Sequence, residues 1–492
     1  MLKEELVELA EQIQKQQAEA QVTEVKAAHE GCPTRLYDTL SSFSNQDNGG
    51  VIVFGMNEKT KFESVGVYDL QELQKKVTEQ CNQMEPAVRA VFTFAEYQGQ
   101  YIASAEIPAI DVAERPCYYK GAGKVKGSYI RVGDADLPMT DYEIYSYEAF
   151  RKHLHDDERP IERAGLYMLD KNKIADYIND KKKERPQFAL MEENQIYEML
   201  NITRNGVPTL ASIMNFCIYP QGILPQLSIT AIVVPGYEIG DVDEDDARFI
   251  DNKRISGTIA EMVEDAVSFC KRNMKVKTII NAEAGKRLDK TEYPVKAIRE
   301  AVLNAVIHRD YSAHTEGTPI QLNIFKNRLE IHSPGNLYGR MTVDQLGVAK
   351  PDLRNPALAV MTESLTGAEN RYSGIPTIRR EMKNYDLREP IFENRRNEFV
   401  VTLYNSAAGD KTEHDRGINL EDDSIEMKIL DYCREPKLRA EIAGMLEIKT
   451  VFYVMDKYIV PLIEKGKLVM TIPEKPKSKL QRYYTAGNSR NV

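Results

Sequence analysis

The sequence has few cysteines, and no two of them form a recognisable pair. Six cysteines are scattered along 492 residues, with no pair at a metal-site or redox spacing. This distribution fits a reducing compartment and argues against a zinc site, because such sites show closely spaced Cys and His ligands. We therefore expect a cytoplasmic protein without structural zinc.

Long apolar runs and targeting signals are also missing. No stretch of about 18 apolar residues occurs, so we expect no transmembrane helix and no membrane partner. The opening segment, MLKEELVELAEQIQKQQAEA, is charged and has no apolar signal-peptide core. Leucine and isoleucine recur there at helical spacing, which predicts an amphipathic helix over residues 1–20.

A third absence bears on function. The pattern G-x-x-x-x-G-K-[ST], which cradles phosphates in helicase motors, does not occur. The net charge of −10 disfavours a surface coated in basic charge, although binding depends on local patches. From Lys457 onward, however, eight Lys and Arg residues stand against two Glu residues. This asymmetry is consistent with nucleic-acid contact, and equally with a solvated tail.

What is present indicates an α+β multidomain protein. The length predicts about three domains, at roughly 150 residues per domain. Residues 15–150 show the pattern of a mixed α/β domain. Within it we expect a helix at 70–84, a hairpin that turns at 98–99 and a strand over 123–133.

The second and third pieces are separated by a polar linker at 406–423. Residues 160–405 also show an α/β pattern. We expect a helix over 255–271 and another that begins at Pro294, followed by the strands IQLNIF and RLEIHS. Residues 424–492 show three helices and then a basic hairpin, the pattern of a winged helix. A plain three-helix dimerisation domain fits the same pattern.

The segment EAVLNAVIH, residues 300–308, carries a chemical signal. Glu300, Asn304 and His308 follow one another at intervals of four, so a helix places them on one face. A carboxylate and an amide oxygen one turn apart can hold Mg²⁺ and orient a water near a phosphate. Glu300 would then be the general base and Asn304 the metal ligand. From spacing alone, the alternative is an exposed Glu and an Asn that caps or packs.

The motifs around this helix follow a familiar order. They are Arg299-Glu300-Ala301, Asn304-Ala305, His308-Arg309-Asp310-Tyr311-Ser312, then two strands, Ser333-Pro334-Gly335, Arg354-Asn355-Pro356 and Ser373-Gly374-Ile375. Across most of residues 185–400, this order resembles the N-box and glycine boxes of the GHKL ATP-binding fold. It looks closest to the divergent version in bacterial proteins labelled RecG-like helicases or predicted transcriptional regulators.

The resemblance implies a GHKL-like α/β sandwich that binds ATP and Mg²⁺. It puts Asn304 on Mg²⁺ and Glu300 near the attacking water, as the base of an ATPase. The remaining nucleotide contacts that it implies are His308, Ser333, Gly335, Arg354, Asn355 and Gly374. Ser333 stands near the place of the adenine-reading aspartate, and few glycines accompany Gly374. Because fewer backbone N–H groups then face the phosphates, ATP binding is expected but hydrolysis stays open.

The first piece opens with a turn-prone cluster before an apolar run, FSNQDNGGVIVFGMNE at 43–58. Its Asn-Gly-Gly supplies positive-φ residues ahead of a buried strand. Together with TEVKAA at 23–28 and GSYIRVG at 127–133, this stretch resembles the Schlafen AlbA-type domain over about residues 15–150. The resemblance puts the turn Asn48, Gly49 and Gly50 beside the E-x-K strand at the working face, so we expect the turn to serve a site.

That family contains nucleic-acid-binding modules and also ribonucleases with three carboxylates and a divalent metal. Glu19 and Glu24 match the spacing of the first two nuclease carboxylates. The third is expected after the Gly-Val strand, where Asn57 removes a charge, and two carboxylates with an amide hold a metal less well. The alternative for Glu24 is a solvated strand edge shared with Lys26.

Basic residues interleaved with tyrosines predict a nucleic-acid face. In the first piece, cations and aromatic rings alternate so that they could follow a phosphate backbone and stack bases. These residues are Lys120, Lys124, Lys126 and Arg131, with Tyr118, Tyr119 and Tyr129. A solvated hairpin is the alternative. In the third piece we expect a recognition helix over 450–458, with phosphate contacts from Lys449, Lys457, Lys475, Lys477 and Arg482.

These patterns predict a bacterial, nucleotide-responsive DNA-binding protein that acts as a transcriptional regulator, with RNA as an alternative partner. We expect a homo-oligomer. Two nucleic-acid modules around a nucleotide switch would let ATP occupancy change DNA affinity. One alternative is a metal-dependent endoribonuclease that uses Glu19 and Glu24. The other is an assembly protein gated by ATP, with no nucleic-acid role.

Overall fold

The computed structural model describes residues 1–243, 245–280, 287–366, 373–407, 428–446, 455–464, 467–471 and 481–485. The chain divides into two compact units, 1–405 and 406–492. The predicted linker 406–423 begins at this division, and its residues 408–423 lie outside the described residues. In the described part of the chain, no helix is long and apolar enough to cross a membrane.

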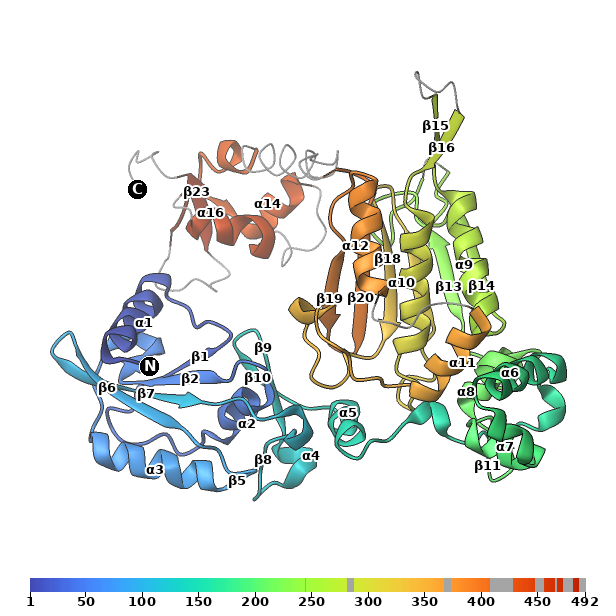
Figure 1. Cartoon of the computed structure of the whole chain (residues 1–492). Helices are drawn as coiled ribbons and strands as arrows, with labels where there is room; N and C mark the ends of the chain where they lie inside the picture. Colours follow the sequence, from blue (N-terminus) through green and yellow to red (C-terminus); the bar gives the residue numbers. More distant parts are fainter. Residues whose placement is uncertain are drawn as a thin grey trace. The chain divides into compact units, whose positions relative to one another are not determined.

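The larger unit begins with a four-stranded sheet covered by helices on both faces (Figure 1). Its strands, in spatial order, are β1 (Thr23–Lys26), β2 (Gly50–Phe54), β7 (Gln100–Ile107) and β6 (Val91–Tyr97). β1 pairs with β2 in parallel, and the other pairs are antiparallel. β6 and β7 form the hairpin expected at 98–99.

Alternation along β2 explains the two covering layers. Ile52 and Phe54 join the core formed with α2 (Tyr37–Asn45) and α3 (Leu70–Asn82). Val53 points the other way and joins a separate core with the amphipathic helix α1 (Lys3–Gln16). This is the two-residue side-chain period of a strand buried on both faces. The amphipathic helix expected over 1–20 is therefore present as α1.

The strand expected over 123–133 is wrong in its first half. Residues 123–127 form the short helix α4 (Gly123–Gly127), and only then does β9 (Tyr129–Val132) begin. Turn hydrogen bonds from the Ala122 and Gly123 backbone N–H groups lead the chain from β8 (Tyr118–Tyr119) into this helix. Its end packs on β8, since a Cβ at Gly127 would lie 2.6 Å from the Tyr119 carbonyl oxygen. The remaining short pairs of this region are β3 (Met56–Asn57) with β4 (Glu63–Ser64), β5 (Met84–Glu85) with β8, and β9 with β10 (Ala135–Pro138).

A six-stranded sheet forms the centre of residues 160–405. Its strands, in spatial order, are β14 (Asp251–Ile255), β13 (Ile229–Val233), β17 (Ile320–Ile324), β18 (Arg328–Pro334), β20 (Glu398–Tyr404) and β19 (Ile391–Arg395). β13 and β17 are parallel, and all other neighbours are antiparallel. The two strands expected from IQLNIF and RLEIHS are β17 and β18.

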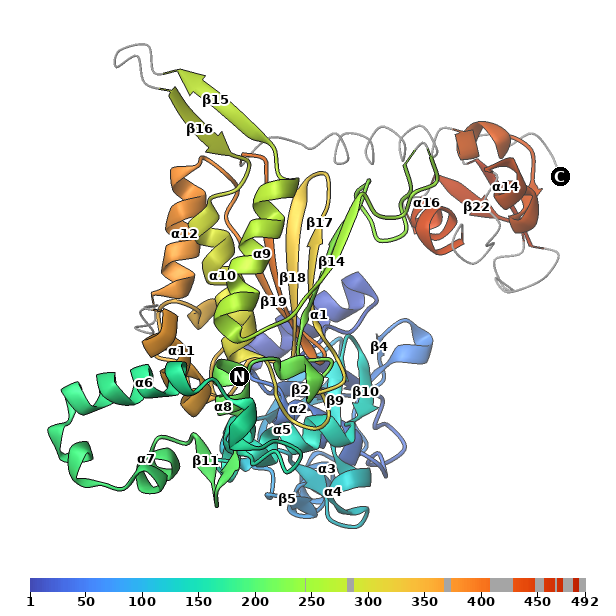
Figure 2. The ribbon, with the colours of Figure 1, turned by 90° about the vertical axis from the view of Figure 1, so that its right-hand side faces the viewer.

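Three helices lie side by side on one face of this sheet (Figure 2). They are α9 (Ile259–Asn273), α10 (Val295–His308) and α12 (Gly374–Asn384). α10 follows Pro294, as predicted. The helix expected from residue 255 begins later, because Ile255 still pairs in β14 and Thr258 forms a capping box with Glu261.

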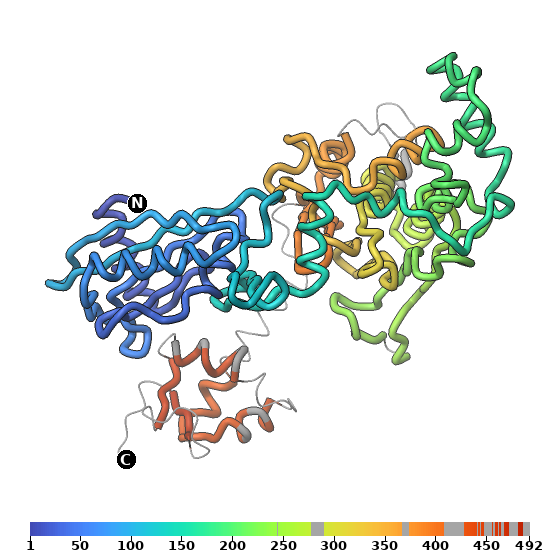
Figure 3. The backbone as a smooth tube through the Cα atoms, turned by 90° about the horizontal axis from the view of Figure 1, so that it is seen from below, coloured from blue at the N-terminus to red at the C-terminus, as the bar shows by residue number. Residues whose placement is uncertain are grey.

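Smaller elements surround the six-stranded sheet. They are α6 (Lys171–Glu184), α7 (Glu193–Met199), the hairpin β11 (Thr203–Arg204) and β12 (Val207–Pro208), α8 (Leu210–Phe216) and α11 (Pro356–Thr366). The hairpin of β15 (Val276–Ile280) and β16 (Arg287–Thr291) projects from the sheet (Figure 2). Between the two sheets, the chain passes through helix α5 (Asp141–Arg151) (Figure 3).

The smaller unit has its own core and a three-stranded sheet, β21 (Lys437–Leu438), β23 (Arg482–Thr485) and β22 (Leu468–Met470). Its described helices are residues 428–432, α14 (Arg439–Met445), the π-helical turn η8 (Met455–Ile459) and α16 (Val460–Glu464). Residues 450–454 of the expected recognition helix lie outside the described residues.

Candidate functional site

A cavity of about 170 Å³ opens between α10, α12 and the loops that follow β18. Seven of the eight residues expected around a nucleotide line it: Glu300, Asn304, His308, Ser333, Gly335, Arg354 and Gly374. Apolar side chains such as Ile331, Met341 and Val401 form much of the rest. Apolar walls with a few convergent polar groups are typical of small-molecule sites.

The polar end of the cavity is formed by α10 and the first turn of α12. A Cβ on Gly374 would lie 2.8 Å from Asn304 Nδ2 and 3.3 Å from Glu300 Oε2, so the α12 backbone approaches both side chains. Asn304 Nδ2 is enclosed and has no hydrogen-bond partner among the described residues. An unpaired amide beside a helix N-terminus, where the partial charge is positive, suits an anionic ligand.

The carboxyl of Glu300 completes this end. Burial raises the pKa of Glu300 above its ordinary value, and the neighbouring Arg299 only partly opposes that effect. A raised pKa makes the carboxylate a better proton acceptor near neutral pH. Because Mg²⁺ prefers carboxylate and amide oxygens, the pair Glu300 and Asn304 fits a Mg²⁺ bound together with a phosphate.

His308 is on the same face of α10 and has a different character. Its ring lines the cavity and is exposed on that side. Enclosure by surrounding protein atoms, and then the charge of Arg354, lower the pKa of His308 below its ordinary 6.5. The ring is therefore neutral at pH 7 and can accept or donate one hydrogen bond to a ligand.

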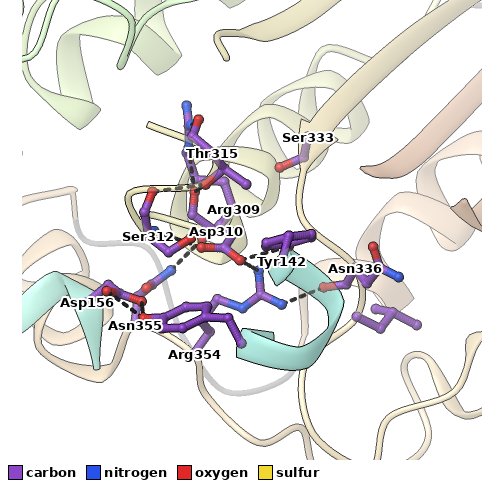
Figure 4. A network of polar contacts seen from close by, with 12 residues as sticks. Tyr142, Asp156, Arg309, Asp310, Ser312, Thr315, Ser333, Asn336, Arg354 and Asn355 are labelled. Atoms are coloured by element: carbon purple, nitrogen blue, oxygen red, sulfur yellow. Dashed lines mark hydrogen bonds and ion pairs between the residues drawn. The ribbon is translucent and has the colours of Figure 1, made fainter. Parts of the chain in front are cut away.

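Arg354 is held at the cavity wall by a buried polar network (Figure 4). Its Nη1 lies 3.2 Å from Asp310 Oδ2, and its Nη2 donates to the Asn336 carbonyl at 2.8 Å. Gly335 has φ +103°, and a Cβ there would lie 2.4 Å from Arg354 Nη1. Only glycine permits this approach, which explains the glycine of the SPG motif.

Asn355 differs from the expectation, because it does not line the cavity. Its side chain is buried, and Nδ2 donates to the carbonyls of Ile307 and Arg309, each at 2.8 Å. It therefore ties the end of α10 to the loop before α11 and supports the wall from behind. Ser333 does line the cavity, and its hydroxyl donates to the Ala305 carbonyl at 2.9 Å.

Sequence reasoning missed two aromatic residues beside Arg354. Tyr338 lines the cavity, with the Arg354 guanidinium over its ring at 5.2 Å. Tyr142, from α5, donates its hydroxyl to Asp310 Oδ2 at 2.8 Å. Tyr338 lies three residues after the glycine of the SPG loop, but no spacing rule selects it. Tyr142 lies 168 residues before its partner Asp310. Asp310 belongs to a recognised motif, whereas Tyr142 belongs to none.

In the first sheet, Glu19 and Glu24 converge on Arg131. The Arg131 Nη1 lies 2.9 Å from Glu24 Oε2 and 2.9 Å from Asp136 Oδ1, and its Nη2 lies 3.6 Å from Glu19 Oε2. Lys26 also pairs with Glu24. Burial, and then repulsion from Glu24, raise the pKa of Glu19. A phosphate contact by Arg131 would require these ion pairs to open, because its side chain is 1% exposed.

These residues do not fit the divalent metal of a nuclease. The Asn57 amide oxygen accepts a hydrogen bond from the Lys59 backbone N–H at 3.1 Å, as the cap of a short turn. Among the described residues, no three His, Cys, Asp or Glu side chains are placed to hold a metal ion. The positive charge of Arg131 already stands between the two carboxylates, where it neutralises them.

The Asn48-Gly49-Gly50 turn has packing reasons for both of its glycines. A Cβ on Gly49, at φ +65°, would lie 2.2 Å from the Ile107 carbonyl oxygen. A Cβ on Gly50 would lie 2.4 Å from the Phe43 ring. Both glycines are buried, whereas Asn48 is exposed. The contact of this turn with nucleic acid stays a prediction, and Asn48 is the residue free to make it.

Of the predicted basic residues of the first domain, Lys124 and Lys126 lie on α4, which packs on β8 with its Tyr118 and Tyr119. Arg131 is instead buried among carboxylates. The Tyr37 ring, which sequence reasoning missed, stacks on Tyr119 at 3.8 Å, and Lys124 lies over Tyr118 at 6.0 Å. Lys126 is exposed. Two cations are paired: Lys120 Nζ lies 3.4 Å from Glu85, and Lys124 Nζ lies 2.6 Å from Glu148. Below, "the α4 face" means the surface formed by Tyr37, Tyr118, Tyr119, Lys120, Lys124 and Lys126.

Little of the expected C-terminal contact set can be placed. Lys449, Lys475 and Lys477 lie outside the described residues, and Lys457 is described only by its backbone, in η8. Arg482 lies in β23, where its Nη1 donates to the Pro436 carbonyl at 3.1 Å. Phosphate contacts by this unit stay a prediction.

Three segments of the chain match known domain families. Residues 19–140 match "Schlafen, AlbA_2". Residues 317–403 match "Putative ATP-dependent DNA helicase recG C-terminal". Residues 425–485 match "Filamentation induced by cAMP protein Fic-like, C-terminal domain". We refer to the first two segments, by these matches, as the Schlafen AlbA_2 domain and the RecG-type domain.

No curated protein matches the chain. Among solved structures, the DIP2311 protein from Corynebacterium diphtheriae is 17% identical over 94% of this chain and 93% of its own, with a TM-score of 0.38. The N-terminal domain of the "Putative ATP-dependent DNA Helicase RecG-related Protein" from Nitrosomonas europaea is 24% identical over 27% of this chain and 93% of its own, with a TM-score of 0.23.

The two matched domains divide the functional residues between them. The Schlafen AlbA_2 domain contains the Arg131 ion-pair cluster and the α4 face. The RecG-type match begins at residue 317, after α10, so it includes Arg354 and Gly374 but neither Glu300 nor Asn304. The cavity joins both sets of residues, which extends the site beyond the matched segment.

Proposed function

We propose that this protein is a nucleotide-responsive DNA-binding protein, a bacterial transcriptional regulator whose RecG-type domain binds ATP with Mg²⁺. The observation that carries the proposal is the polar end of the cavity. There a carboxylate, an unpaired amide and the N-terminus of α12 converge, because the backbone at Gly374 lies close to the side chains of both Glu300 and Asn304.

The chemistry of this end favours a nucleoside triphosphate. Bound Mg²⁺ would neutralise phosphate charge, held by Glu300 and Asn304. Arg354 adds a planar cation to the cavity wall, suited to a phosphate oxygen pair. The apolar part of the lining suits a purine ring. Ser333 offers one hydroxyl where a carboxylate would read adenine, so we infer weak selectivity between purines.

The nucleic-acid half of the proposal rests on the Schlafen AlbA_2 domain and its α4 face. Stacked tyrosines flanked by lysines suit bases and phosphates. We propose DNA as the partner, with RNA as the alternative, and a winged helix in the smaller unit as the second contact, in a cytoplasmic homo-oligomer. The ribonuclease alternative is not favoured, because Arg131 occupies the place of a metal.

Two titrations on the full chain test the proposal. Calorimetry with ATP and Mg²⁺ measures nucleotide affinity for the parent and for Asn304→Ala. Fluorescence anisotropy with a labelled duplex, and with a labelled folded RNA, measures nucleic-acid affinity with and without MgATP. Asn179→Ala is the matched control, since Asn179 lies exposed on helix α6, away from the cavity.

We expect Asn304→Ala to lose MgATP binding while it keeps the parental melting temperature, and Asn179→Ala to behave as the parent. Equal titrations for Asn304→Ala and the parent would refute the nucleotide site. Absence of DNA and RNA binding, together with dimerisation on addition of ATP, would favour the assembly protein instead. Cleavage of the RNA would favour the ribonuclease.

A further inference from the structure

Helix α5 (Asp141–Arg151) follows the Schlafen AlbA_2 domain and lies between the two sheets of the larger unit (Figures 1 and 3). Its position is not that of a passive linker. Side chains along one helix contact the wall of the cavity, the six-stranded sheet and the α4 face. Its contacts with the cavity wall and with the α4 face are polar, buried or both. A displacement of α5 at one of these surfaces therefore affects its contacts at the other.

On the cavity side, α5 contacts the residues that hold Arg354. The Tyr142 hydroxyl donates to Asp310 Oδ2 at 2.8 Å, and the Arg354 Nη1 forms an ion pair with the same oxygen at 3.2 Å (Figure 4). At the other end of the helix, the Phe150 ring meets Tyr338 edge-on, with centroids 5.4 Å apart. Tyr338 and Arg354 both line the cavity, so α5 reaches it through two separate residues.

A bidentate ion pair fastens the helix to the six-stranded sheet. The Arg396 Nε and Nη2 donate to the two carboxylate oxygens of Glu143 at 2.8 and 2.9 Å. Glu143 is buried, and it also caps the helix start through Thr140. Arg396 lies in the turn between β19 and β20. Because planar bidentate pairs fix orientation, this contact anchors the start of α5 to the six-stranded sheet.

On the other side, α5 contacts the predicted nucleic-acid surface. Glu148 Oε1 accepts from Lys124 Nζ at 2.6 Å, which neutralises one cation of the α4 face. Tyr147 lies 5.9 Å from the Arg115 guanidinium. Arg115 in turn donates to Asp47 Oδ1 at 2.9 Å and to the Gln46 carbonyl at 3.0 Å, immediately before the exposed Asn48.

We propose that α5 couples nucleotide occupancy of the cavity to nucleic-acid binding by the Schlafen AlbA_2 domain, with Tyr142 as a positioning residue for Arg354. This inference rests on the proposed function and specifies how its two sites communicate. A bound polyphosphate competes with Asp310 for the Arg354 guanidinium. Asp310 then keeps only its hydrogen bonds from Tyr142 and from the Ser312 backbone N–H. As a result α5 tilts about the Glu143–Arg396 pair, and Glu148 withdraws from Lys124.

The proposed direction is therefore that nucleotide raises nucleic-acid affinity. A freed Lys124 adds one phosphate contact to the α4 face, and the salt dependence of binding steepens accordingly. By linkage, nucleic acid must tighten nucleotide binding by the same factor. That reciprocity is a requirement of equilibrium coupling and gives a second, independent measurement of the same quantity.

The test uses Tyr142→Phe in the full chain, because this change removes one hydroxyl and keeps the ring. The matched control is Tyr197→Phe, whose hydroxyl donates to a carboxylate, that of Glu193, at the same 2.8 Å, within helix α7. For each protein, anisotropy gives the ratio of duplex affinities with and without MgATP. Calorimetry gives the nucleotide affinity in the absence of DNA.

We expect a parental ratio of about fivefold or more, the lower range of allosteric coupling. Tyr142→Phe should reduce the ratio to below about twofold while nucleotide still binds, and Tyr197→Phe should keep the parental ratio. Glu148→Gln is a second variant at the far end of the helix. It should raise duplex affinity in the absence of nucleotide, because the amide holds Lys124 less tightly, and it should also lower the ratio.

The outcomes separate this inference from the proposed function. A parental ratio preserved in both Tyr142→Phe and Glu148→Gln overturns the role of α5 and leaves the proposed function standing. A parent that binds nucleotide and duplex independently, with a ratio of one, also overturns the coupling alone. A parent that binds no nucleotide overturns the proposed function, and the coupling with it.

Discussion

Replacing Gly374 by alanine should disturb ligand binding at the polar end of the cavity without lowering the stability of the fold. The new methyl carbon would stand 2.8 Å from Asn304 Nδ2 and 3.1 Å from Asn304 Oδ1. Contacts this close are not tolerated, so the Asn304 side chain must rotate away. Because the clashing atoms are the end of a side chain and not backbone, the adjustment costs little in folding free energy.

The effect on ligand binding should be much larger than the effect on stability. Loss of one hydrogen bond to a charged group costs about 1.5–3 kcal/mol, which corresponds to about a ten- to a hundredfold loss of affinity. For folding, alanine is better than glycine by about 1 kcal/mol in a helix interior and by less at Gly374, the first residue of α12, so helix propensity offsets part of the cost of the side-chain rotation. We therefore expect Gly374→Ala to weaken MgATP binding by about ten- to a hundredfold without lowering the melting temperature.

Gly444→Ala is the matched control. Gly444 lies in helix α14, and a Cβ there would meet nothing within 4 Å, so only the helix propensity changes. Calorimetric titration with MgATP and thermal unfolding of both variants measure the two effects separately. Unchanged affinity in Gly374→Ala would refute the assignment of this end to the phosphates. A lowered melting temperature with proportionally lost binding would show a folding defect instead.

Two further predictions concern residues outside the ligand contacts. Since Glu19 has a raised pKa in the fold, its ionisation lowers stability as pH rises from its ordinary 4.5 through the raised value. Glu19→Gln should therefore raise the free energy of unfolding by more than about 1 kcal/mol at pH 8 and leave it unchanged at pH 4, as measured by urea unfolding at both pH values. Asn355→Ala should lower the free energy of unfolding by about 1–3 kcal/mol, because two buried carbonyls lose their donor, and an unchanged urea midpoint would contradict that role.

The sequence predicts the part of the cavity that local spacing controls. Glu300, Asn304 and His308 share a face of α10 because a helix repeats every 3.6 residues. Gly335 and Arg354 lie on separate loops and Gly374 lies in the first turn of α12. No spacing rule brings these three residues together, but the order of motifs in a known fold does. Residue types and spacing alone therefore predict only the part of the cavity that α10 forms.

Contacts distant in sequence were not predictable. Tyr142 and Asp310 are 168 residues apart, and neither the tyrosine nor its neighbours carry a pattern that names a partner. The type of a polar side chain did not identify its partner either. Arg131 was expected on a phosphate and lies among carboxylates, whereas Asn355 was expected on the nucleotide and supports backbone carbonyls. Residue type states which hydrogen bonds are possible, but only the packed structure decides which partner supplies them.

Three buried arginines differ in whether they can exchange their partners. Arg309 and Arg131 are structural, whereas Arg354 can exchange its counter-charge. Arg309 is enclosed and donates to the carbonyls of Thr315 and Thr318, and Arg131 is 1% exposed among carboxylates. Removing either from its partners would leave buried charge or buried carbonyls unpaired, at a cost of several kcal/mol.

Arg354 alone of these three also lines the cavity, where a phosphate can replace Asp310 as its counter-charge. In this exchange Arg354 keeps a counter-charge, and the buried Asp310 carboxylate keeps its hydrogen bonds from the Tyr142 hydroxyl and the Ser312 backbone N–H. The ligand must therefore offset the loss of one buried ion pair. Under the proposed function, the switch therefore depends on nucleotide occupancy, and slow hydrolysis at Glu300 would suit it by prolonging the occupied state.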